Sequence, residues 1–397
     1  MAYFIVLLAA VCATTLSHGQ GSRWVGTWSA SPQLVETRNL PPPPGLAGNT
    51  LREVIQASIG GSRLRVRFSN RFGSSPVTIT SGHIALSTGR SAIKAGTDRT
   101  LKFHGKPWVT IPPGASAHSD PFEFNLAALS DLAVTTCFGA CSVDVTGHPG
   151  SRTTSYLQAG NQVSAGVLPA AVKTAHWYIL DGVDVQANHS TAALVTLGDS
   201  ITDGRGSGTD KNDRWPDDLA RRLQASKDAR QVAVLNAGIG GNCVLHGGLG
   251  PTALSRFGRD VLSQSGVRWL IVFEGVNDIG TSRDANVAAV GRNLVAAYKQ
   301  FIYQAHAHRI RVYGATITPF GGSFYDTPAH EAVRQTVNEW IRTGGGFDAV
   351  IDFDAVLRDP RHPRRLLRAA DSGDHLHPNE RGYHKMADAI GLKLFEN

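Results

Sequence analysis

Four short polar or glycine-rich segments in the second half of the chain carry the residue types that acyl transfer needs. They are GDSIT (198–202), NAGIGGN (236–242), GVND (275–278) and SGDHLHP (372–378). Together they supply a serine hydroxyl that could act as a nucleophile, donors for an oxyanion, and a histidine with a carboxylate beside it. A serine after a strand is weak evidence alone, because serine is also common in turns and as a helix cap. The prediction therefore depends on all four segments lying together.

The elements around these segments predict that they meet at one edge of a parallel sheet. Apolar runs typical of buried strands alternate with helical stretches from about residue 192, which indicates a sheet covered by helices on both faces. The first three segments each follow one of these strands, and open α/β sheets build their sites at the carboxyl ends of strands. The expected strands are 192–197, 231–237, 269–275, 309–317 and 349–357, and the expected helices are 215–226, 286–307 and 329–343.

The first half of the chain has a β pattern. In RLRVRFS (63–69), apolar residues alternate strictly with arginines or serine, which is typical of a half-buried strand. Other short runs of this kind are separated by Gly, Pro, Ser and Asn, and nothing there resembles a long amphipathic helix. This pattern predicts an all-β sandwich domain over residues 22–187. The other expected strands are 76–86, 108–114, 131–138 and 175–185.

In their order and separations, the four segments resemble the conserved blocks of the SGNH (GDSL) hydrolase superfamily of esterases and lipases. The resemblance covers roughly residues 193–397, and all four blocks are present. It implies a three-layer α/β/α, flavodoxin-like hydrolase domain over residues 192–397 that cleaves carboxylic esters. The first half resembles the β-sandwich that precedes this domain in one secreted subgroup, some members of which deacetylate plant polysaccharides.

The resemblance implies roles for five residues. Ser200 would attack the ester carbonyl, and His377 would take its proton and later donate it to the leaving alcohol. Asp374 would bind the imidazole Nδ1 and fix its tautomer. The backbone N–H groups of Ser200 and Gly241 and the side-chain amide of Asn277 would hold the oxyanion. Loss of one such donor typically costs about 3 kcal/mol of transition-state stabilisation.

Several neighbours of these residues are rivals or have structural interpretations. His375 is a rival base, but the base of the family pattern directly precedes proline, which selects His377. Asp371 is a rival acid that lies farther from His377 in the chain than Asp374 does. Asn277 is also open to a helix-cap interpretation. Structural roles, in hydrogen bonds, caps or tight turns, are expected for Asp199, Asp278, Gly238 and Gly240.

The N-terminus and the cysteines indicate an exported protein. An apolar stretch near the N-terminus is too short to span a bilayer and leads into small and polar residues, which predicts a signal peptide over residues 1–20. Cys137 and Cys141 flank a three-residue turn, and we expect a disulfide across a hairpin there. Cys243 is expected as a buried free thiol. Asn188 begins a glycosylation sequon, which matters only in a eukaryotic host.

Composition excludes several other classes of protein. With 397 residues, 42% of them hydrophobic and 18% charged, the chain is globular and long enough for two domains. Much of the net charge of +7 lies in RDPRHPRRLLR (358–368), a run typical of a solvated face, so no nucleic-acid binding is expected. No later segment is apolar for long enough to be inserted in a membrane. Without an HExxH, Walker A or zinc-type spacing, neither a metal nor an organic cofactor is expected.

These observations predict a secreted serine esterase that removes acetyl or other short acyl groups from a carbohydrate. A lipase or arylesterase of broader specificity is the alternative among enzymes. A polysaccharide-binding protein with an inert hydrolase domain is the alternative outside enzymes, and a peptidase is disfavoured for want of an evident peptide groove.

Some aromatic residues are candidate contacts for such a substrate. In FGGSFYDTP (320–328), Phe320, Phe324 or Tyr325 could line the leaving-group side, and a plain surface loop is equally consistent. The tryptophans of the first half lie in strand patterns, so we expect them in the core and not on a sugar-binding platform. They are Trp24, Trp28, Trp108 and Trp177.

Overall fold

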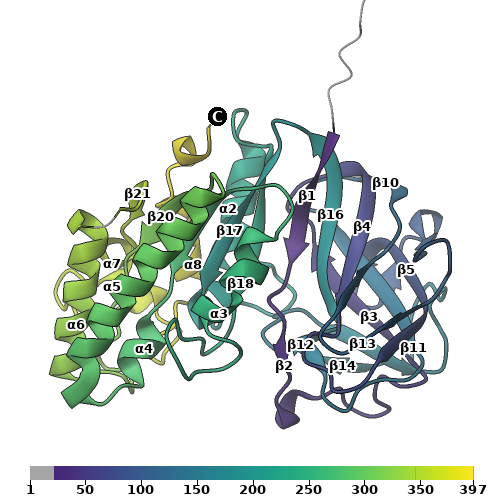
Figure 1. Ribbon diagram of the computed structural model, residues 1–397, viewed down its shortest axis with the longest axis horizontal. Coiled ribbons are helices and arrows are strands. Elements are labelled where there is room, and N and C mark those ends of the chain that lie inside the picture. Colours follow the sequence, from purple (N-terminus) through teal and green to yellow (C-terminus); the bar gives the residue numbers. More distant parts are fainter. Residues whose placement is uncertain (1–21, 345, 397) are drawn as a thin grey trace, which may run out of the picture.

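The computed structural model of the protein describes residues 22–344 and 346–396. The predicted signal peptide, residues 1–20, lies outside the described residues. Figure 1 shows a strand-rich first half, coloured purple to teal, beside a helix-rich second half, coloured green to yellow.

Two antiparallel sheets form the first half, as its alternating pattern predicts. In β4 (Gly61–Ser69), Leu64, Val66 and Phe68 are buried while the arginines between them are only partly covered. One sheet contains β1 (Ser22–Ser29), β16 (Leu180–Asn188), β4 and β10 (Phe122–Leu126), with β9 (Ser116–His118) beside β4. The other contains β14 (Val172–Thr174), β13 (Ser155–Ala159), β3 (Asn49–Gln56), β11 (Asp131–Phe138), β5 (Val77–Gly89) and β6 (Ala92–Ile93), with β7 (Arg99–Thr100) and β8 (Val109–Ile111) beside β5. A small third sheet is made of β15 (Trp177–Tyr178), β12 (Thr146–His148) and β2 (Gln33–Leu34).

The expectation that the tryptophans are core residues is only half right. Trp28 and Trp177 are buried. Trp108 is 46% exposed, and Trp24 is half-buried. The last two rings lie against basic side chains, at 5.0 and 4.6 Å from the ring centroids. Such a cation covers part of an aromatic face that the core leaves open.

The predicted disulfide is not formed: Cys137 and Cys141 are both free thiols. The prediction assumed a hairpin turn between them. Instead, the Gly139 N–H donates to the Thr78 carbonyl and the Thr78 N–H donates to the Ala140 carbonyl. Residues 139 and 140 therefore pair with β5 and not with each other in a hairpin of their own.

The second half contains a five-stranded parallel sheet. Its order along the sheet is β18 (Val232–Gly238), β17 (Ala192–Gly198), β19 (Val267–Phe273), β20 (Arg311–Ala315) and β21 (Ala349–Ile351). Numbered from the first strand of this half, the order is 2-1-3-4-5, the order of flavodoxin-like folds. Residues 349–357 were expected to form one strand, but only the first three do, because Asp352 accepts the Ala355 N–H and caps a helix.

Helices cover both faces of this sheet, and alternate residues of each strand face them. Leu194 of β17 packs with the apolar side chains of α2 (Trp215–Ala225), α7 (Phe353–Leu357) and α8 (Glu380–Asp388). Val195 packs with those of α3 (Ala253–Phe257), α5 (Asp284–Ala307) and α6 (Pro328–Glu339), and Figure 1 shows α5 and α6 in front of the sheet. No helix of the described residues combines the length and apolarity needed to cross a membrane.

Two further helices and six short helical turns complete the described elements. The helices, α1 (Ser200–Asp203) and α4 (Val276–Gly280), follow strands of the parallel sheet. The turns are η1 (Thr37–Asn39), η2 (Ala95–Thr97), η3 (Gly258–Leu262), η4 (Trp340–Gly344), η5 (Arg368–Ala370) and η6 (Leu392–Phe395).

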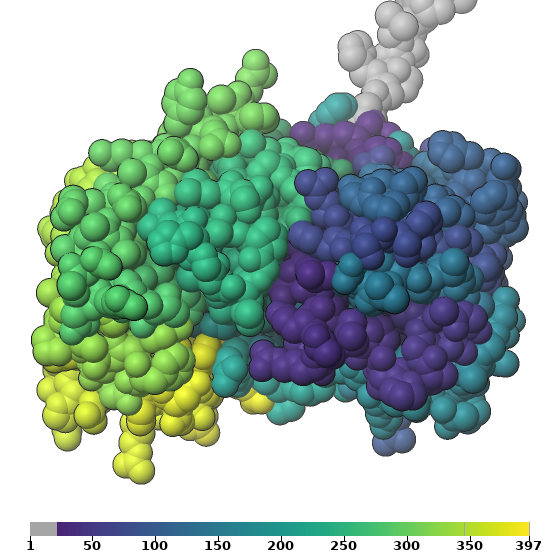
Figure 2. Space-filling model, turned by 60° about the horizontal axis from the view of Figure 1, so that its bottom comes forward, coloured from purple at the N-terminus to yellow at the C-terminus, as the bar shows by residue number. Residues whose placement is uncertain are grey.

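The two halves share one apolar core. Buried side chains of both sandwich sheets, the parallel sheet and α5 form a single contiguous cluster, and Figure 2 shows the halves pressed together. Strand β1 lies against β18 so closely that a Cβ on Gly26 would come within 2.8 Å of the Leu235 side chain. A separation of the two halves would therefore expose core residues of both.

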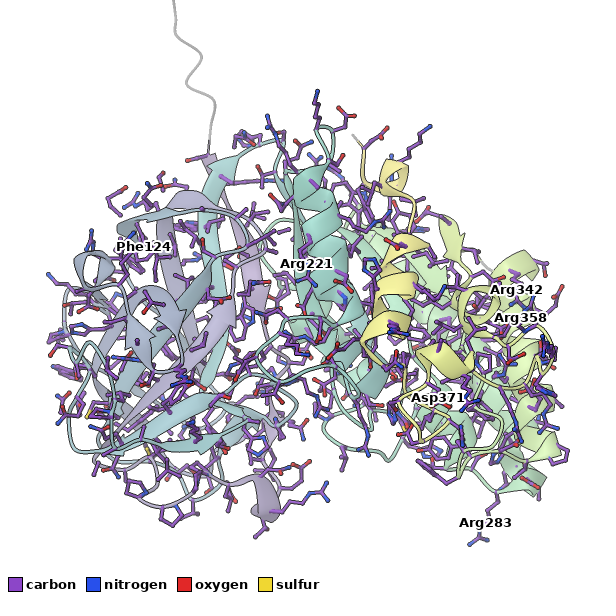
Figure 3. All side chains as sticks on the ribbon, turned by 180° about the vertical axis from the view of Figure 1, so that it is seen from behind. Phe124, Arg221, Arg283, Arg342, Arg358 and Asp371 are labelled. Carbon is purple, nitrogen blue, oxygen red and sulfur yellow. The ribbon has the colours of Figure 1, made fainter. Side chains whose placement is uncertain are left out.

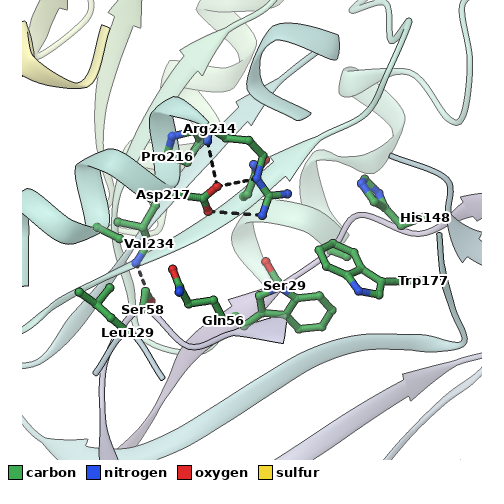
Figure 4. Close-up of a pocket in the computed structure, with 14 residues that line it drawn as sticks. Ser29, Gln56, Ser58, Leu129, His148, Trp177, Arg214, Pro216, Asp217 and Val234 are labelled. Carbon is green, nitrogen blue, oxygen red and sulfur yellow. Dashed lines mark hydrogen bonds and ion pairs between the residues drawn. The ribbon is translucent and has the colours of Figure 1, made fainter. Parts of the chain in front are cut away.

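A small cavity remains between the halves (Figure 4). Its walls include Ser58 and Trp177 from the first half and Arg214 and Val234 from the second. The Val234 N–H donates to Ser58 Oγ at 3.0 Å across it. A volume of about 30 Å³ suits a single water molecule, so this cavity is a packing gap and not a substrate site.

The arginine-rich run 358–368 is largely exposed, as predicted for a solvated face. Figure 3 shows its first residue, Arg358, beside Arg342 at the end of the second half that is remote from the sandwich. Both guanidinium groups bind Asp354, at 3.4 and 2.6 Å.

Candidate active site

Ser200 stands at the turn from β17 into α1. The strand ends at Gly198, where a Cβ would lie 2.0 Å from Thr202 Oγ1. Asp199 caps the helix, since its Oδ1 accepts the Ile201 N–H at 2.9 Å, and this is the structural hydrogen bond expected of it. Burial raises the pKa of Asp199 to about 7. The tight strand-to-helix turn presents the serine hydroxyl at the carboxyl end of the sheet.

The structure brings Ser200, His377 and Asp374 into one hydrogen-bonded line. Ser200 Oγ lies 2.8 Å from His377 Nε2, and His377 Nδ1 lies 2.7 Å from Asp374 Oδ2. The other Asp374 oxygen accepts the backbone N–H of His377 at 2.9 Å. Because Asp374 holds both the ring and the backbone of His377, the imidazole is aimed at the serine with Nδ1 carrying its proton.

The local environment keeps this histidine neutral and this aspartate ionised. Burial lowers the pKa of His377 below its usual value, and Arg205 and Arg152 lower it further, against the opposing effect of Asp374. Burial alone would raise the pKa of Asp374, but the hydrogen bonds from His377 outweigh it and bring that pKa to about 2. A neutral imidazole beside a hydroxyl can act as a general base.

The rival base and the rival acid pair with each other instead. His375 Nδ1 lies 2.6 Å from Asp371 Oδ2, and the His375 side chain is 51% exposed. His375 also has a left-handed backbone, with a φ of 61°, and forms no contact with the serine hydroxyl.

Asn277, in α4, has an amide whose orientation is determined by its neighbours. Its Nδ2 donates to the Asn242 carbonyl at 2.7 Å, and its Oδ1 accepts from the Tyr325 hydroxyl at 3.0 Å. Because a carbonyl oxygen can only accept, the NH₂ end must point toward Asn242. The second hydrogen of that NH₂ group is then available for an oxyanion.

Gly241 lines the same pocket as Asn277 and directly precedes Asn242, whose carbonyl binds the Asn277 amide. Its φ of 72° favours glycine, and a Cβ there would lie 3.2 Å from Leu249. Among the described residues no acceptor is found for the backbone N–H of either Ser200 or Gly241. Both donors are therefore available to substrate. Gly238 needs its small size for packing, since a Cβ there would lie 2.3 Å from the Asp203 nitrogen.

Asp278 has a structural position, although not the expected one at the start of the next helix. That helix, α5, has Arg283 as its N-cap. Asp278 instead accepts the N–H groups of Val244 and Leu245 at 2.8 and 2.9 Å. It thereby holds the loop that follows Gly241. Cys243, in the same loop, is a buried free thiol, as predicted.

One residue that sequence reasoning missed joins the strand ends behind the site. Arg256 is fully buried and donates to the carbonyls of Gly198 and Ala237 at 3.0 and 2.6 Å. It also pairs with Asp260 and Glu274, at 3.1 and 3.3 Å. Its position between two strand ends follows from tertiary packing, and no local pattern around it in the sequence signals this role.

A pocket of about 480 Å³ opens over the serine. Ser200, Gly241, Asn277 and His377 line it, and Asp374 stands behind His377. The first half of the chain also lines this pocket, with Gln33, Glu36, Arg38, Asn39, Pro149, Gly150, Arg152 and His176. The sequence offered no indication that the sandwich would reach the site.

The loop 320–328 meets the pocket with only two of its three aromatic residues. Phe324 and Tyr325 line the wall. Phe320 is fully buried in the core, so the prediction that it could contact the leaving group is wrong.

The described part of the chain has no group of three or more His, Cys, Asp or Glu side chains placed to hold a metal ion. The absence of a cofactor stays a prediction.

Comparison with known proteins agrees with the resemblance of the four segments. Residues 196–385 match the model of the GDSL-like lipase/acylhydrolase family, and no curated protein matches the chain. Three solved structures are similar to about half of the chain. A protein of Desulfitobacterium hafniense described as lipolytic and of the G-D-S-L family is 22% identical, with a TM-score of 0.38 over 50% of this chain and 97% of its own. A GDSL-like lipase of Bacteroides thetaiotaomicron is 18% identical, with a TM-score of 0.34 over 50% of this chain and 85% of its own. An acetylxylan esterase of Geobacillus stearothermophilus is 20% identical, with a TM-score of 0.38 over 50% of this chain and 91% of its own.

Proposed function

Residues 196–385 belong to the GDSL-like lipase/acylhydrolase family, so the protein is a carboxylic-ester hydrolase, and from this premise we propose a narrower function. We infer that it is a secreted serine esterase that removes acetyl or other short acyl groups from a carbohydrate. The observation that carries the proposal is the line of hydrogen bonds from Ser200 through His377 to Asp374 in the wall of an open, polar pocket.

In the acylation step, Ser200 Oγ attacks the ester carbonyl while His377 Nε2 takes the hydroxyl proton. The carbonyl oxygen becomes an oxyanion, which the N–H groups of Ser200 and Gly241 and the free amide hydrogen of Asn277 stabilise. When the tetrahedral intermediate collapses, the bond to the alcohol breaks and His377 gives its proton to the departing oxygen.

In the deacylation step, water replaces the alcohol. His377 takes a proton from this water, and the resulting hydroxide attacks the acyl group on Ser200. The same three donors hold the second oxyanion, and His377 then returns the proton to Ser200 Oγ as the carboxylic acid leaves. Asp374 stays ionised throughout and stabilises the imidazolium that forms in each step.

The composition of the pocket wall supports a short acyl group and a polar alcohol. Most of the side chains that line it are polar or charged, and the apolar ones are Pro149, Leu249, Phe324, Tyr325 and Leu376. Hydroxyl-rich sugars suit such a wall, whereas a long acyl chain needs a mostly apolar one.

The experiment that tests the proposal compares acid release from p-nitrophenyl esters of rising chain length and from acetylated xylan and pectin. We expect the acetyl ester to be hydrolysed fastest and at least one acetylated polymer to be attacked. Ser200→Ala should lose activity by several decades. If longer chains react faster and the polymers are untouched, a lipase or arylesterase replaces this proposal. If Ser200→Ala changes nothing, the serine mechanism is wrong.

Secretion is tested separately, on the full-length chain in its own host. The N-terminus of the protein recovered from the culture medium should begin close to residue 21. If the protein stays inside the cell with its N-terminus intact, the proposal of secretion is wrong.

A further inference from the structure

Three arginines line the pocket around Ser200. Arg38 and Arg152 come from the sandwich half, and Arg205 comes from the chain directly after α1. The cations therefore approach the serine from both halves of the molecule.

The positive charges of these arginines are poorly neutralised by the protein. Arg38 is exposed, and among the described residues it has no hydrogen bond or ion pair. The side chain of Arg205 is 63% exposed, and its nearest carboxylate oxygen, on Asp374, is 3.9 Å away and already hydrogen-bonded to His377. Arg152 lies 3.6 Å from Asp203, but its Nε is buried without a hydrogen-bond partner in the described structure.

The two carboxylates that line the same pocket neutralise the arginines only in part. Glu36 accepts hydrogen bonds from Gln33 and Asn39, at 2.8 and 2.9 Å. Asp203 is only 1% exposed, and His148 lies against one of its oxygens at 2.8 Å. Its other oxygen has no hydrogen bond within the described structure and lies 3.6 Å from Arg152. Neither carboxylate forms a bidentate pair with a guanidinium group. The arginines therefore keep N–H donors for an incoming anion.

Two of these guanidinium groups act on the catalytic histidine. Arg205 and Arg152 both help to lower the pKa of His377, although burial is the larger cause. Both arginines also line the pocket that Ser200 and His377 line, so a substrate bound there lies within reach of their charges. His176, which also lines the pocket, has a pKa lowered by burial. Its Nδ1 donates to the Pro149 carbonyl at 2.6 Å, so its Nε2 can accept a hydrogen bond from a sugar hydroxyl without added charge.

We propose that the alcohol part of the substrate carries a carboxylate, as a uronic acid does, and that Arg38, Arg152 and Arg205 bind it. A guanidinium group presents donors in a planar fork that matches a carboxylate. The sandwich half is then part of the substrate site and not only a neighbour of the hydrolase half. This inference rests on the proposed esterase function and specifies its substrate class.

The test uses a matched pair of substrates, an O-acetylated methyl glucuronoside as the free acid and the same sugar as its neutral methyl ester. We measure acetate release by the full-length enzyme at about 20 mM and about 500 mM salt. We expect kcat/KM for the acid to exceed that for the methyl ester by about tenfold at low salt. This ratio should approach one at high salt, because salt screens partly exposed charges.

Variants separate the arginines from general charge effects. Arg152→Gln, Arg205→Gln and Arg38→Gln should each lower the acid-to-ester ratio, mainly through a higher KM for the acid. Arg38 is exposed, so its replacement tests the proposal even where Arg152→Gln folds poorly. Arg292→Gln, an exposed position on the outer face of α5, removes the same charge elsewhere and should leave the ratio as it is.

The possible failures are distinguishable. If the wild type cleaves both sugars with equal kcat/KM at low salt, or if the ratio is the same in all variants, the uronate inference is wrong while the esterase proposal stands. If the wild type cleaves neither sugar nor p-nitrophenyl acetate, both are wrong.

Discussion

The Tyr325 hydroxyl donates a 3.0 Å hydrogen bond to Oδ1 of Asn277. Asn277 thus has its oxygen held by one neighbour and its nitrogen by the Asn242 carbonyl. These two hydrogen bonds prevent a flip of the Asn277 side-chain amide. A flipped amide would present its oxygen to the oxyanion and repel it. Tyr325 is in this sense a positioning residue for the oxyanion donor.

Tyr325→Phe should lower kcat for p-nitrophenyl acetate by about five- to tenfold, because a neutral hydrogen bond contributes about 1 kcal/mol. Asn277→Ala should cost about a hundredfold or more, as the loss of an oxyanion donor does. Since Tyr325 acts through Asn277, the double variant should be no slower than Asn277→Ala. Tyr303→Phe, on an exposed helix position, is the control. Additive losses in the double variant would show that the two residues act independently.

The pH profile should report the neutral form of His377. Catalysis needs the unprotonated imidazole, so kcat/KM should rise with pH as His377 loses its proton. Because burial lowers that pKa from 6.5, the midpoint of the rise should lie below pH 6.5. Arg205 opposes protonation of His377, so Arg205→Gln should move this midpoint to higher pH. A midpoint that moves down, or a rise centred above 6.5 in the wild type, would contradict the assignment.

Much of the site geometry could be predicted because it depends on local pattern and strand order. Ser200, Gly241 and Asn277 each follow a strand of one parallel sheet, and such strand ends meet at one edge. His377 and Asp374 are three residues apart in one loop, so their contact is local. The prediction of one strand over 349–357 is wrong, because the apolar residues of this segment suit both a strand and a helix, although Asp352 is a recognisable N-cap residue.

The contribution of the sandwich to the site could not be predicted. His148 and Asp203 are 55 residues apart, and their contact depends on how two separately patterned halves pack together. The same holds for Arg38, in the short helical turn η1, and for Arg152, in a loop, neither of which carries a motif. The failed disulfide has a related cause, because the pairing partner of residues 138–141 is β5, a strand far from them in sequence.

Thiol labelling should find three free cysteines among the described residues. In unfolded but unreduced protein that lacks residues 1–20, and with them Cys12, Cys137, Cys141 and Cys243 should all react, with the mass of three adducts. In the native protein only Cys141, which is partly exposed, should react, and slowly, because burial and the neighbouring Cys137 raise its pKa to about 12. Labelling of Cys243 alone in the unfolded protein would show that Cys137 and Cys141 form the disulfide after all.

His148→Ala should reduce both stability and activity, because it removes the contact that the sandwich makes with the nucleophile helix. His148 Nε2 lies 2.8 Å from Asp203, and both side chains are almost fully buried. Asp203 is the last residue of α1, whose first residue is Ser200. Without His148, the Asp203 carboxylate would stay buried with only Arg152 at 3.6 Å. Removal of one partner of a buried pair costs about 3 kcal/mol or more, and we expect a loss of this size in the free energy of unfolding.

The matched control is His306→Ala. His306 also pairs with an aspartate, Asp348, at 2.9 Å, but its side chain is 44% exposed, and such surface pairs contribute under about 1 kcal/mol. His148→Gln, whose amide can still donate to Asp203, should recover part of the loss in kcat. These variants are compared by urea unfolding and by kcat for p-nitrophenyl acetate. If His148→Ala is as stable and as active as His306→Ala, the sandwich does not position the nucleophile. If it is less stable but fully active, the contact supports the fold alone.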